Sequence, residues 1–244
     1  MTKTAWVFPG QGSQAIGMGM DLLELPDARA KFEQAESVLG WSVIDVCQSQ
    51  DSKVSHTLYT QPCLYVVEII LADLLKAKGQ HPDCVAGHSL GEYSALYAAG
   101  VFGFEDGLRL IKRRAELMDS ASDGMMAALI GFNRPNLEAA IAQTPDVVLA
   151  NDNNEGQVVI SGTPEAVEIV LNQVKTKRSI RLSVSGAFHS PLMADAATQF
   201  KTVLDSVPFT AAQVPVLSNV DPIPSTDPAV LKDRLDRQMT SSVR

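Results

Sequence analysis

The stretch VAGHSLGEYSAL, residues 85–96, places Ser89 between Gly87 and Gly91. A short apolar segment precedes the serine and a helical pattern follows it, which predicts a strand, a sharp turn and a helix. Gly-x-Ser-x-Gly at such a junction is typical of a nucleophile elbow, whose tight backbone lifts the hydroxyl above a parallel sheet. The alternative is an ordinary strand-to-helix junction, because a five-residue match also occurs by chance. Either way, the stretch predicts an α/β fold.

Bulk properties narrow the class of protein. The 244 residues are 45% hydrophobic, enough for one large domain or for a core with a smaller insert. The net charge of −8 argues against nucleic acid as a partner. Cys47, Cys63 and Cys84 lack paired spacing, which suits reduced thiols and argues against a zinc site. The start lacks a signal-peptide core, and the longest apolar run is broken by acids. We expect a cytoplasmic protein with no membrane partner.

The first half of the chain alternates strands and helices. The pattern predicts strands over 4–10 (short and buried) and 83–87, and helices over 27–40, 61–79, 90–100 and 104–122. Gly40 and Gly79 are placed to end two of these helices, and Pro62 is expected in the first turn of its helix.

From Met125 the rhythm changes. The pattern predicts strand, helix, two strands, helix and strand over 125–132, 134–144, 147–162, 163–176 and 178–186, with Thr163 as N-cap. This order is ferredoxin-like. We therefore expect an α/β-hydrolase-like parallel-sheet core over 1–124 and 186–244, with a ferredoxin-like inserted domain over 125–185. The tail is broken by prolines and then helical.

A serine nucleophile needs a base, and four histidines are available. His56 and His81 lie in polar or turn segments, and His88 adjoins Ser89, so its side chain should point away from the hydroxyl. His189 lies in a loop between a strand and a helix. By elimination His189 is the candidate base, and a merely hydrogen-bonded loop histidine is the alternative.

The remaining catalytic groups are less well marked. An acid between serine and histidine is expected in hydrolases of that order, and five aspartates lie there without a distinctive setting: Asp106, Asp119, Asp123, Asp146 and Asp152. A carbonyl oxygen that orients the imidazole is the alternative. For the oxyanion, the N–H of Leu90 is one candidate donor, and the glycine-rich loop 9–14 can supply a second.

The same loop admits a competing reading as a dinucleotide fingerprint. Gly10, Gly12 and Ala15 have its spacing after a strand. The fingerprint requires an acid at the end of a second strand, whereas Glu33 and Glu36 fall within a helical pattern. The nucleotide reading is therefore weak.

With FPGQGSQ, GHSLGEYSAL and FHSPLM, the sequence resembles malonyl-CoA:acyl carrier protein transacylases over residues 3–244. The resemblance implies a ping-pong reaction with no cofactor and no metal, in which a serine carries malonyl from malonyl-CoA to acyl carrier protein for fatty acid or polyketide synthesis. It implies these roles: Ser89 nucleophile, His189 base, Gln11 and Leu90 oxyanion donors, Arg114 carboxylate ligand, Phe188 substrate contact, and Gln238 carbonyl to orient the histidine. We expect a monomer.

Two further features bear on function. Arg114 makes physical sense for a malonyl group, because a planar guanidinium can hold a carboxylate bidentately. Lys112 and Arg113 cannot share its direction on a helix and are expected in solvent.

Members of the family continue past the segment that holds Gln238, so we expect the C-terminal end of the core to be truncated here. A serine esterase and an inactive carrier-binding domain are the other functional hypotheses.

Overall fold

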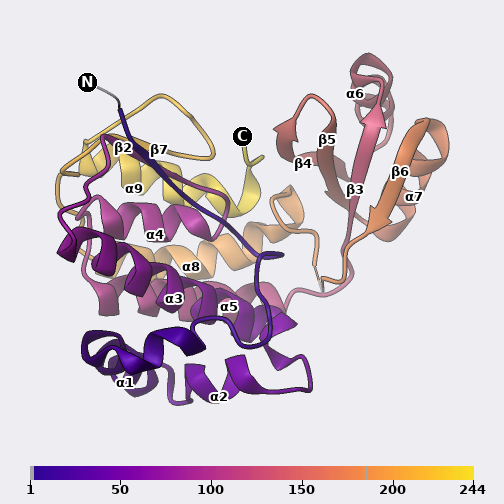
Figure 1. Ribbon diagram of the computed structural model, residues 1–244. Coiled ribbons are helices and arrows are strands. Elements are labelled where there is room, and N and C mark those ends of the chain that lie inside the picture. Colours follow the sequence, from indigo (N-terminus) through magenta and orange to yellow (C-terminus); the bar gives the residue numbers. More distant parts are fainter. Residues whose placement is uncertain (1–2, 185) are drawn as a thin grey trace.

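The computed structural model describes residues 3–184 and 186–244, and its strands form two sheets (Figure 1). The first is parallel, with the order β1 (Ala5–Phe8), β2 (Cys84–Gly87), β7 (Val216–Leu217). The second is antiparallel, with the order β4 (Val147–Asn154), β5 (Gln157–Gly162), β3 (Met125–Phe132), β6 (Thr176–Arg181). The fold is therefore α/β, with a parallel sheet and a separate antiparallel sheet.

Helices pack around the parallel sheet. They are α1 (Pro26–Leu39), α2 (Val43–Gln48), α3 (Thr57–Ala77), α4 (Gly91–Ala98), α5 (Phe104–Asp119), α8 (Ala194–Ser206) and α9 (Pro228–Arg237). Short 3-10 turns cover Met20–Glu24, Lys53–Ser55, Pro191–Met193 and Gln238–Thr240. Helix α4 packs on β1 and β2, α3 packs on α4 and α5, and α8 lies between α5 and α9. This arrangement buries the middle of α3 completely, including Tyr65 and Ile69.

Helix α3 begins earlier than its sequence predicts. Pro62 lies inside the helix rather than in its first turn. The Thr60 hydroxyl donates to the carbonyls of Val54 (2.7 Å) and His56 (3.0 Å), so contacts with the preceding turn extend the helix backwards. By length and hydropathy alone α3 could cross a membrane, but 67% of that stretch is buried inside the fold. Burial of this kind is typical of a core helix.

Strand β1 differs from the buried strand that the sequence predicts. Within the described residues it pairs with β2 alone, and Val7 is 71% exposed. The apolar residues of β1 predicted a buried strand, but β1 lies at the edge of the sheet, and this position exposes Val7. Strand β6 ends at Arg181, so the predicted strand over 178–186 starts and ends too late. The sequence does not predict β7, because a strand of two residues has no detectable period.

The antiparallel sheet stands apart from the core helices in Figure 1. Helices α6 (Arg134–Gln143) and α7 (Pro164–Gln173) connect its strands and pack on it, over an apolar core that includes Leu129 and Ile160. The predicted cap at Thr163 is confirmed, since its side chain accepts from the N–H of Ala166 at 3.3 Å.

The chain leaves the core and returns to it at almost one point. A Cβ atom on Gly124 would lie 2.0 Å from the backbone nitrogen of Ala187. Only glycine allows two backbones to approach so closely. Ser185, the last residue of the predicted insert, lies outside the described residues.

Candidate active site

Ser89 lies in the turn between β2 and α4, in the order that the sequence predicts. Its φ is 51°, in the left-handed region that non-glycine residues rarely adopt and that clusters at functional sites. The flanking glycines are sterically required. A Cβ on Gly87 would lie 2.0 Å from the carbonyl carbon of Gly91, and a Cβ on Gly91 would lie 2.2 Å from the carbonyl oxygen of Phe8.

Asn219 holds the elbow from the neighbouring strand. Its Oδ1 accepts the N–H of Ser89 at 2.7 Å, and its Nδ2 donates to the carbonyl of Gly87 at 2.6 Å. Asn219 follows β7, so it lies at the same carboxyl edge of the sheet as Ser89. The sequence analysis missed it, because the two-residue strand β7 and the Ser218 that separates it from Asn219 form no recognisable pattern.

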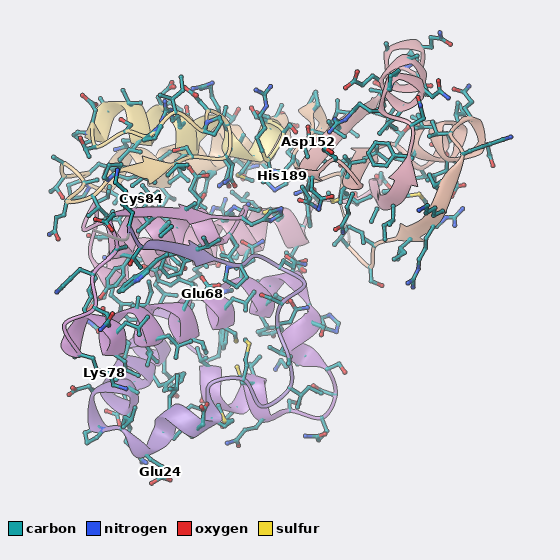
Figure 2. All side chains as sticks on the ribbon, turned by 45° about the horizontal axis from the view of Figure 1, so that its top comes forward. Glu24, Glu68, Lys78, Cys84, Asp152 and His189 are labelled. Atoms are coloured by element: carbon teal, nitrogen blue, oxygen red, sulfur yellow. The ribbon has the colours of Figure 1, made fainter. Side chains whose placement is uncertain are left out.

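His189 contacts the serine directly. Its Nε2 lies 2.7 Å from the Oγ of Ser89, and its Nδ1 lies 2.9 Å from the carbonyl oxygen of Gln238. Because a carbonyl only accepts, Nδ1 carries the proton and Nε2 presents a lone pair to the serine hydroxyl. Figure 2 shows His189 where the core meets the antiparallel sheet.

The environment keeps His189 neutral. Burial, and secondarily the charge of Arg114, lower the pKa of His189 from 6.5 to about 3. A neutral imidazole can accept a proton at ordinary pH. His88 is turned elsewhere, since its Nε2 lies 2.9 Å from the Oδ1 of Asn153 on β4.

Arg114 also reaches the serine. Its guanidinium is almost fully buried, at 1% exposure. Nη1 donates to the Oε1 of Gln61 at 2.8 Å, and Nη2 donates to the Oγ of Ser89 at 2.9 Å and to the Oε1 of Gln238 at 3.1 Å. All three acceptors are neutral, so the cation is available to a carboxylate. Gln61 is a second residue that the sequence analysis missed.

The neighbouring cations point away, as the helical geometry predicts. Lys112 donates to the carbonyl of Val38 at 3.0 Å, and Arg113 pairs with Glu116 at 3.2 Å.

A cavity of about 220 Å³ opens over the serine. Its lining from the core includes Gln11, Ser89, Arg114, Phe188 and His189, and its lining from the antiparallel sheet includes Met126, Ala128, Asn151, Asn153, Gln157 and Val159. Leu90 is fully buried at the start of α4, and the side chain of Gln11 donates to Thr57 at 3.0 Å. The cavity therefore lies between the two sheets.

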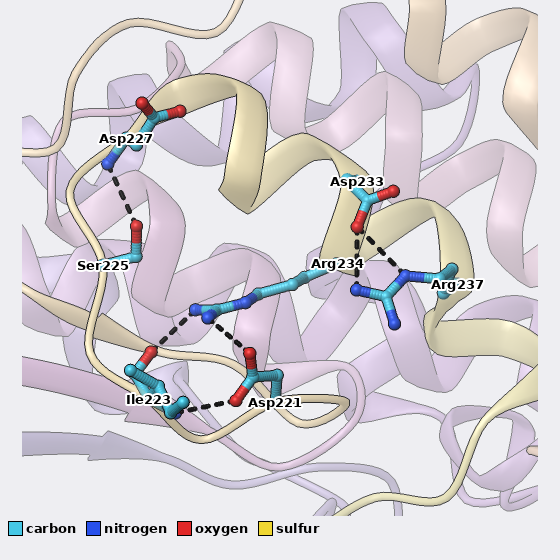
Figure 3. Close-up of polar contacts among 7 residues, drawn as sticks. All are labelled: Asp221, Ile223, Ser225, Asp227, Asp233, Arg234 and Arg237. Atoms are coloured by element: carbon cyan, nitrogen blue, oxygen red, sulfur yellow. Dashed lines mark hydrogen bonds and ion pairs between the residues drawn. The ribbon is translucent and has the colours of Figure 1, made fainter.

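Polar contacts fix the segment that precedes Gln238, and Figure 3 shows several of them among residues 221–237. Arg234 donates to the carbonyl of Ile223 and to the carboxylate of Asp221, both at 2.7 Å. Asp227 caps α9 by accepting from two backbone N–H groups. These contacts hold α9 against the loop after Asn219, which brings Gln238 to the site.

No group of three or more His, Cys, Asp or Glu within residues 3–184 and 186–244 has the geometry to bind a metal ion.

Comparison with known proteins identifies the family. Residues 5–244 match the acyl transferase domain. The malonyl CoA-acyl carrier protein transacylase of Synechocystis sp. is 58% identical over 242 residues, which cover 99% of this chain and 83% of that protein. Its crystal structure superposes with a TM-score of 0.98, covering 100% of this chain and 83% of that one. The chain belongs to the malonyl-CoA:acyl carrier protein transacylase family.

More distant relatives match this acyltransferase over its whole length. The Bacillus subtilis malonyl CoA-acyl carrier protein transacylase is 41% identical, over 100% of this chain and 81% of that protein. A malonyl-transacylase solved in complex with its type II PKS acyl-carrier protein is 35% identical, with a TM-score of 0.92 over 100% of this chain and 82% of that one.

Proposed function

We propose that this acyltransferase moves a malonyl group from malonyl-CoA to the phosphopantetheine thiol of acyl carrier protein, which supplies extender units for fatty acid synthesis. The names of its relatives support this substrate pair. The observation that carries the proposal is the convergence on the Oγ of Ser89 of a neutral base, His189 at 2.7 Å, and a buried cation, Arg114 at 2.9 Å. A base activates the nucleophile, and a buried cation selects an acyl group that ends in a carboxylate.

In the first half-reaction, Ser89 attacks the thioester carbonyl carbon and its proton passes to Nε2 of His189. The N–H groups of Gln11 and Leu90 stabilise the oxyanion. Collapse of the tetrahedral intermediate breaks the C–S bond, and the departing CoA thiolate takes the proton from His189. The product is a malonyl ester of Ser89.

In the second half-reaction, the carrier's thiol gives its proton to His189 and attacks the ester carbonyl. The Ser89 oxygen leaves and recovers the proton. Because Nδ1–H of His189 donates to the Gln238 carbonyl, no carboxylate is needed to orient the base. The protons and electrons balance within the two half-reactions, so the proposal includes no cofactor or metal.

Substrate selection is proposed for two residues. Arg114 binds the malonyl carboxylate in place of its neutral partners. Phe188, which is 5% exposed and lines the cavity, excludes an α-methyl branch by crowding it.

The strand order β4-β5-β3-β6, with α6 and α7 as the connecting helices, supports a ferredoxin-like insert over 125–185. We propose that this insert interrupts an α/β-hydrolase-like core over 1–124 and 186–244. We further propose a monomer in the cytoplasm.

Labelled malonyl-CoA tests the function. We expect a stable malonyl adduct on Ser89 that carrier thiol removes, and no adduct in Ser89→Ala. Release of free malonate without an adduct would instead indicate a hydrolase. An adduct that persists in Ser89→Ala would overturn the assignment of the nucleophile.

A further inference from the structure

A buried carboxyl group lies directly beneath the elbow. Glu92 is in the first turn of α4, three residues after Ser89, and is 0% exposed. Its Oε2 accepts from the Nε2 of Gln238 at 2.6 Å and from the backbone N–H of Asn219 at 3.3 Å. Both partners belong to the network around Ser89. The reaction proposed above gives Glu92 no part.

Gln238 connects this carboxyl group to the reacting residues. Its two N–H donors go to Glu92 and to the carbonyl of Ser89, the latter at 2.9 Å, while its Oε1 accepts from Arg114. Its backbone carbonyl accepts from Nδ1 of His189. One residue therefore contacts the base, the cation and the backbone of the nucleophile.

Glu92 fixes the orientation of that amide. An amide side chain can turn over and exchange its oxygen and nitrogen. The Oε2 of Glu92 already accepts the N–H of Asn219, so it presents lone pairs to the nitrogen of Gln238. The oxygen of that amide then faces Arg114, which only donates. The turned-over amide would direct N–H groups at a guanidinium and an oxygen at a carboxylate.

The second contact extends the same effect to the elbow. The Asn219 N–H that Glu92 accepts belongs to the residue whose side chain holds the N–H of Ser89. Glu92 thus limits the movement of the loop after β7 relative to α4.

Stability alone does not explain a carboxyl group at this position. Burial raises the pKa of Glu92, and an apolar side chain of similar volume at such a site is often neutral or stabilising.

We infer that Glu92 is a positioning residue for acyl transfer, which acts through Gln238 and Asn219 to hold His189 and Ser89 in register. The inference rests on the proposed function only for malonyl-CoA, the substrate used to measure acylation rates. A displacement of about 1 Å at reacting groups lowers rates roughly 10²-fold, and this sets the size of the expected effect.

The test compares Glu92→Met with Glu92→Gln. The methionine removes the acceptor, and we expect kcat of Ser89 acylation by malonyl-CoA to fall by roughly 10²-fold with little change in KM. The glutamine keeps an acceptor oxygen in the place of Oε2, and we expect it to restore most of the rate. Equal rates in Glu92→Met and wild type, or equal losses in both variants, would overturn the inference.

Glu68 provides the matched control. It is another buried carboxyl group, 6% exposed on α3, bonded to Ser94 rather than to the site, and Figure 2 places it inside the core. Glu68→Met should alter the melting temperature but not the acylation rate. If it lowers the rate as Glu92→Met does, the effect is general destabilisation. If Glu92→Met does not fold, Glu92→Asp takes its place in the test, because the shorter side chain moves the acceptor oxygen away by one methylene.

A double-mutant cycle with Gln238→Ala tests the route of the effect. If Glu92 acts mainly through Gln238, Glu92→Met should cost much less in the Gln238→Ala background than in wild type. Additive losses contradict this route.

A neutral fluorophosphonate that labels serine nucleophiles separates the inference from the proposed function. Its reaction with Ser89 needs no malonyl group, and it should slow in Glu92→Met and recover in Glu92→Gln. This pattern supports the inference even if malonyl-CoA proves not to be the substrate. Unchanged labelling in Glu92→Met overturns the inference even if malonyl transfer is found.

Discussion

Arg114 donates to the Oγ of Ser89. In Arg114→Ala the malonyl carboxylate would be buried without a partner, which costs roughly 3–5 kcal/mol, or on the order of 10²–10⁴ in rate. Acetyl-CoA has no such carboxylate, so its transfer should change little. The rate of acetyl transfer could also rise, because the Oγ of Ser89 would no longer accept a hydrogen bond from Arg114. The ratio of acylation rates from the two thioesters measures this. An equal fall for both contradicts carboxylate binding by Arg114.

The lowered pKa of His189 predicts how kcat/KM depends on pH. Its pKa is lowered to about 3, so the base stays deprotonated as pH falls through 6.5 and is lost only near the lowered value. We expect kcat/KM for malonyl-CoA, which reports the free enzyme, to stay nearly level from about pH 8 to about pH 5. A fall in kcat/KM centred near the ordinary histidine pKa would show that the imidazole is not desolvated in solution.

His189→Ala should lower Ser89 acylation by roughly 10²–10⁴-fold, the usual contribution of a positioned base. His88→Ala is the matched control, because that ring bonds to Asn153 instead. A larger loss in His88→Ala than in His189→Ala would reverse the assignment.

Sequence reasoning reached the residues that carry a recognisable local pattern. Ser89 has its glycines, and His189 followed by elimination. Asn219 and Gln61 have no such pattern, since their importance depends on β7 and α3 bringing distant segments to one edge. Gln238 came only from the family resemblance, because a backbone carbonyl has no sequence signature.

Among the elements, the β2–α4 junction depends most on backbone contact. Gly87→Ala and Gly91→Ala would each place a Cβ within 2.0–2.2 Å of backbone atoms, which cannot move as a side chain can. We expect each variant to lose about 3 kcal/mol or more of unfolding free energy. Gly103→Ala is the control, since its Cβ would meet nothing within 4 Å. Chemical denaturation compares the three, and similar midpoints would contradict the tight junction.

The predicted bounds of helices and strands are most accurate where the hydrophobic pattern continues over many residues. Helices α1 and α5 and strand β3 match their patterns closely. The errors at β1 and at the start of α3 have different causes. The exposure of an edge strand is set by neighbours that the local sequence does not contain. The earlier start of α3 comes from hydrogen bonds of the Thr60 side chain to Val54 and His56, which periodicity alone does not reveal.

At the scale of the whole molecule, cations gather on one part of a protein with a net charge of −8. Lys175, Lys177 and Arg178 are exposed on and beside β6, and Arg181 pairs with Glu168 at 2.6 Å. An acidic carrier protein that docks there would associate faster. Reversing Lys177 and Arg178 to Glu should therefore slow transfer to the carrier and leave acylation by malonyl-CoA unchanged.

The matched control for that reversal is Arg29→Glu with Lys78→Glu, which makes the same charge change on α1 and just after α3. Added salt should reproduce the effect of the Lys177 and Arg178 reversal, because exposed charges are screened beyond roughly 8–10 Å. If both double variants slow carrier transfer equally, net charge rather than a docking face is responsible.

The close approach of Gly124 to Ala187 has an evolutionary consequence. One continuous stretch of the sequence contains β3, β4 and β5, which form a wall of the cavity, while Ser89, Arg114, His189 and Gln238 lie outside that stretch. Recombination at two neighbouring points in space could replace the whole wall with a foreign one. The reacting groups would keep their spacing, because Gly124 and Ala187, where the exchanged stretch joins the core, already lie next to each other. Such an exchange can reshape the cavity beside Arg114 and Phe188 in one genetic event, whereas point mutations must change the wall residue by residue.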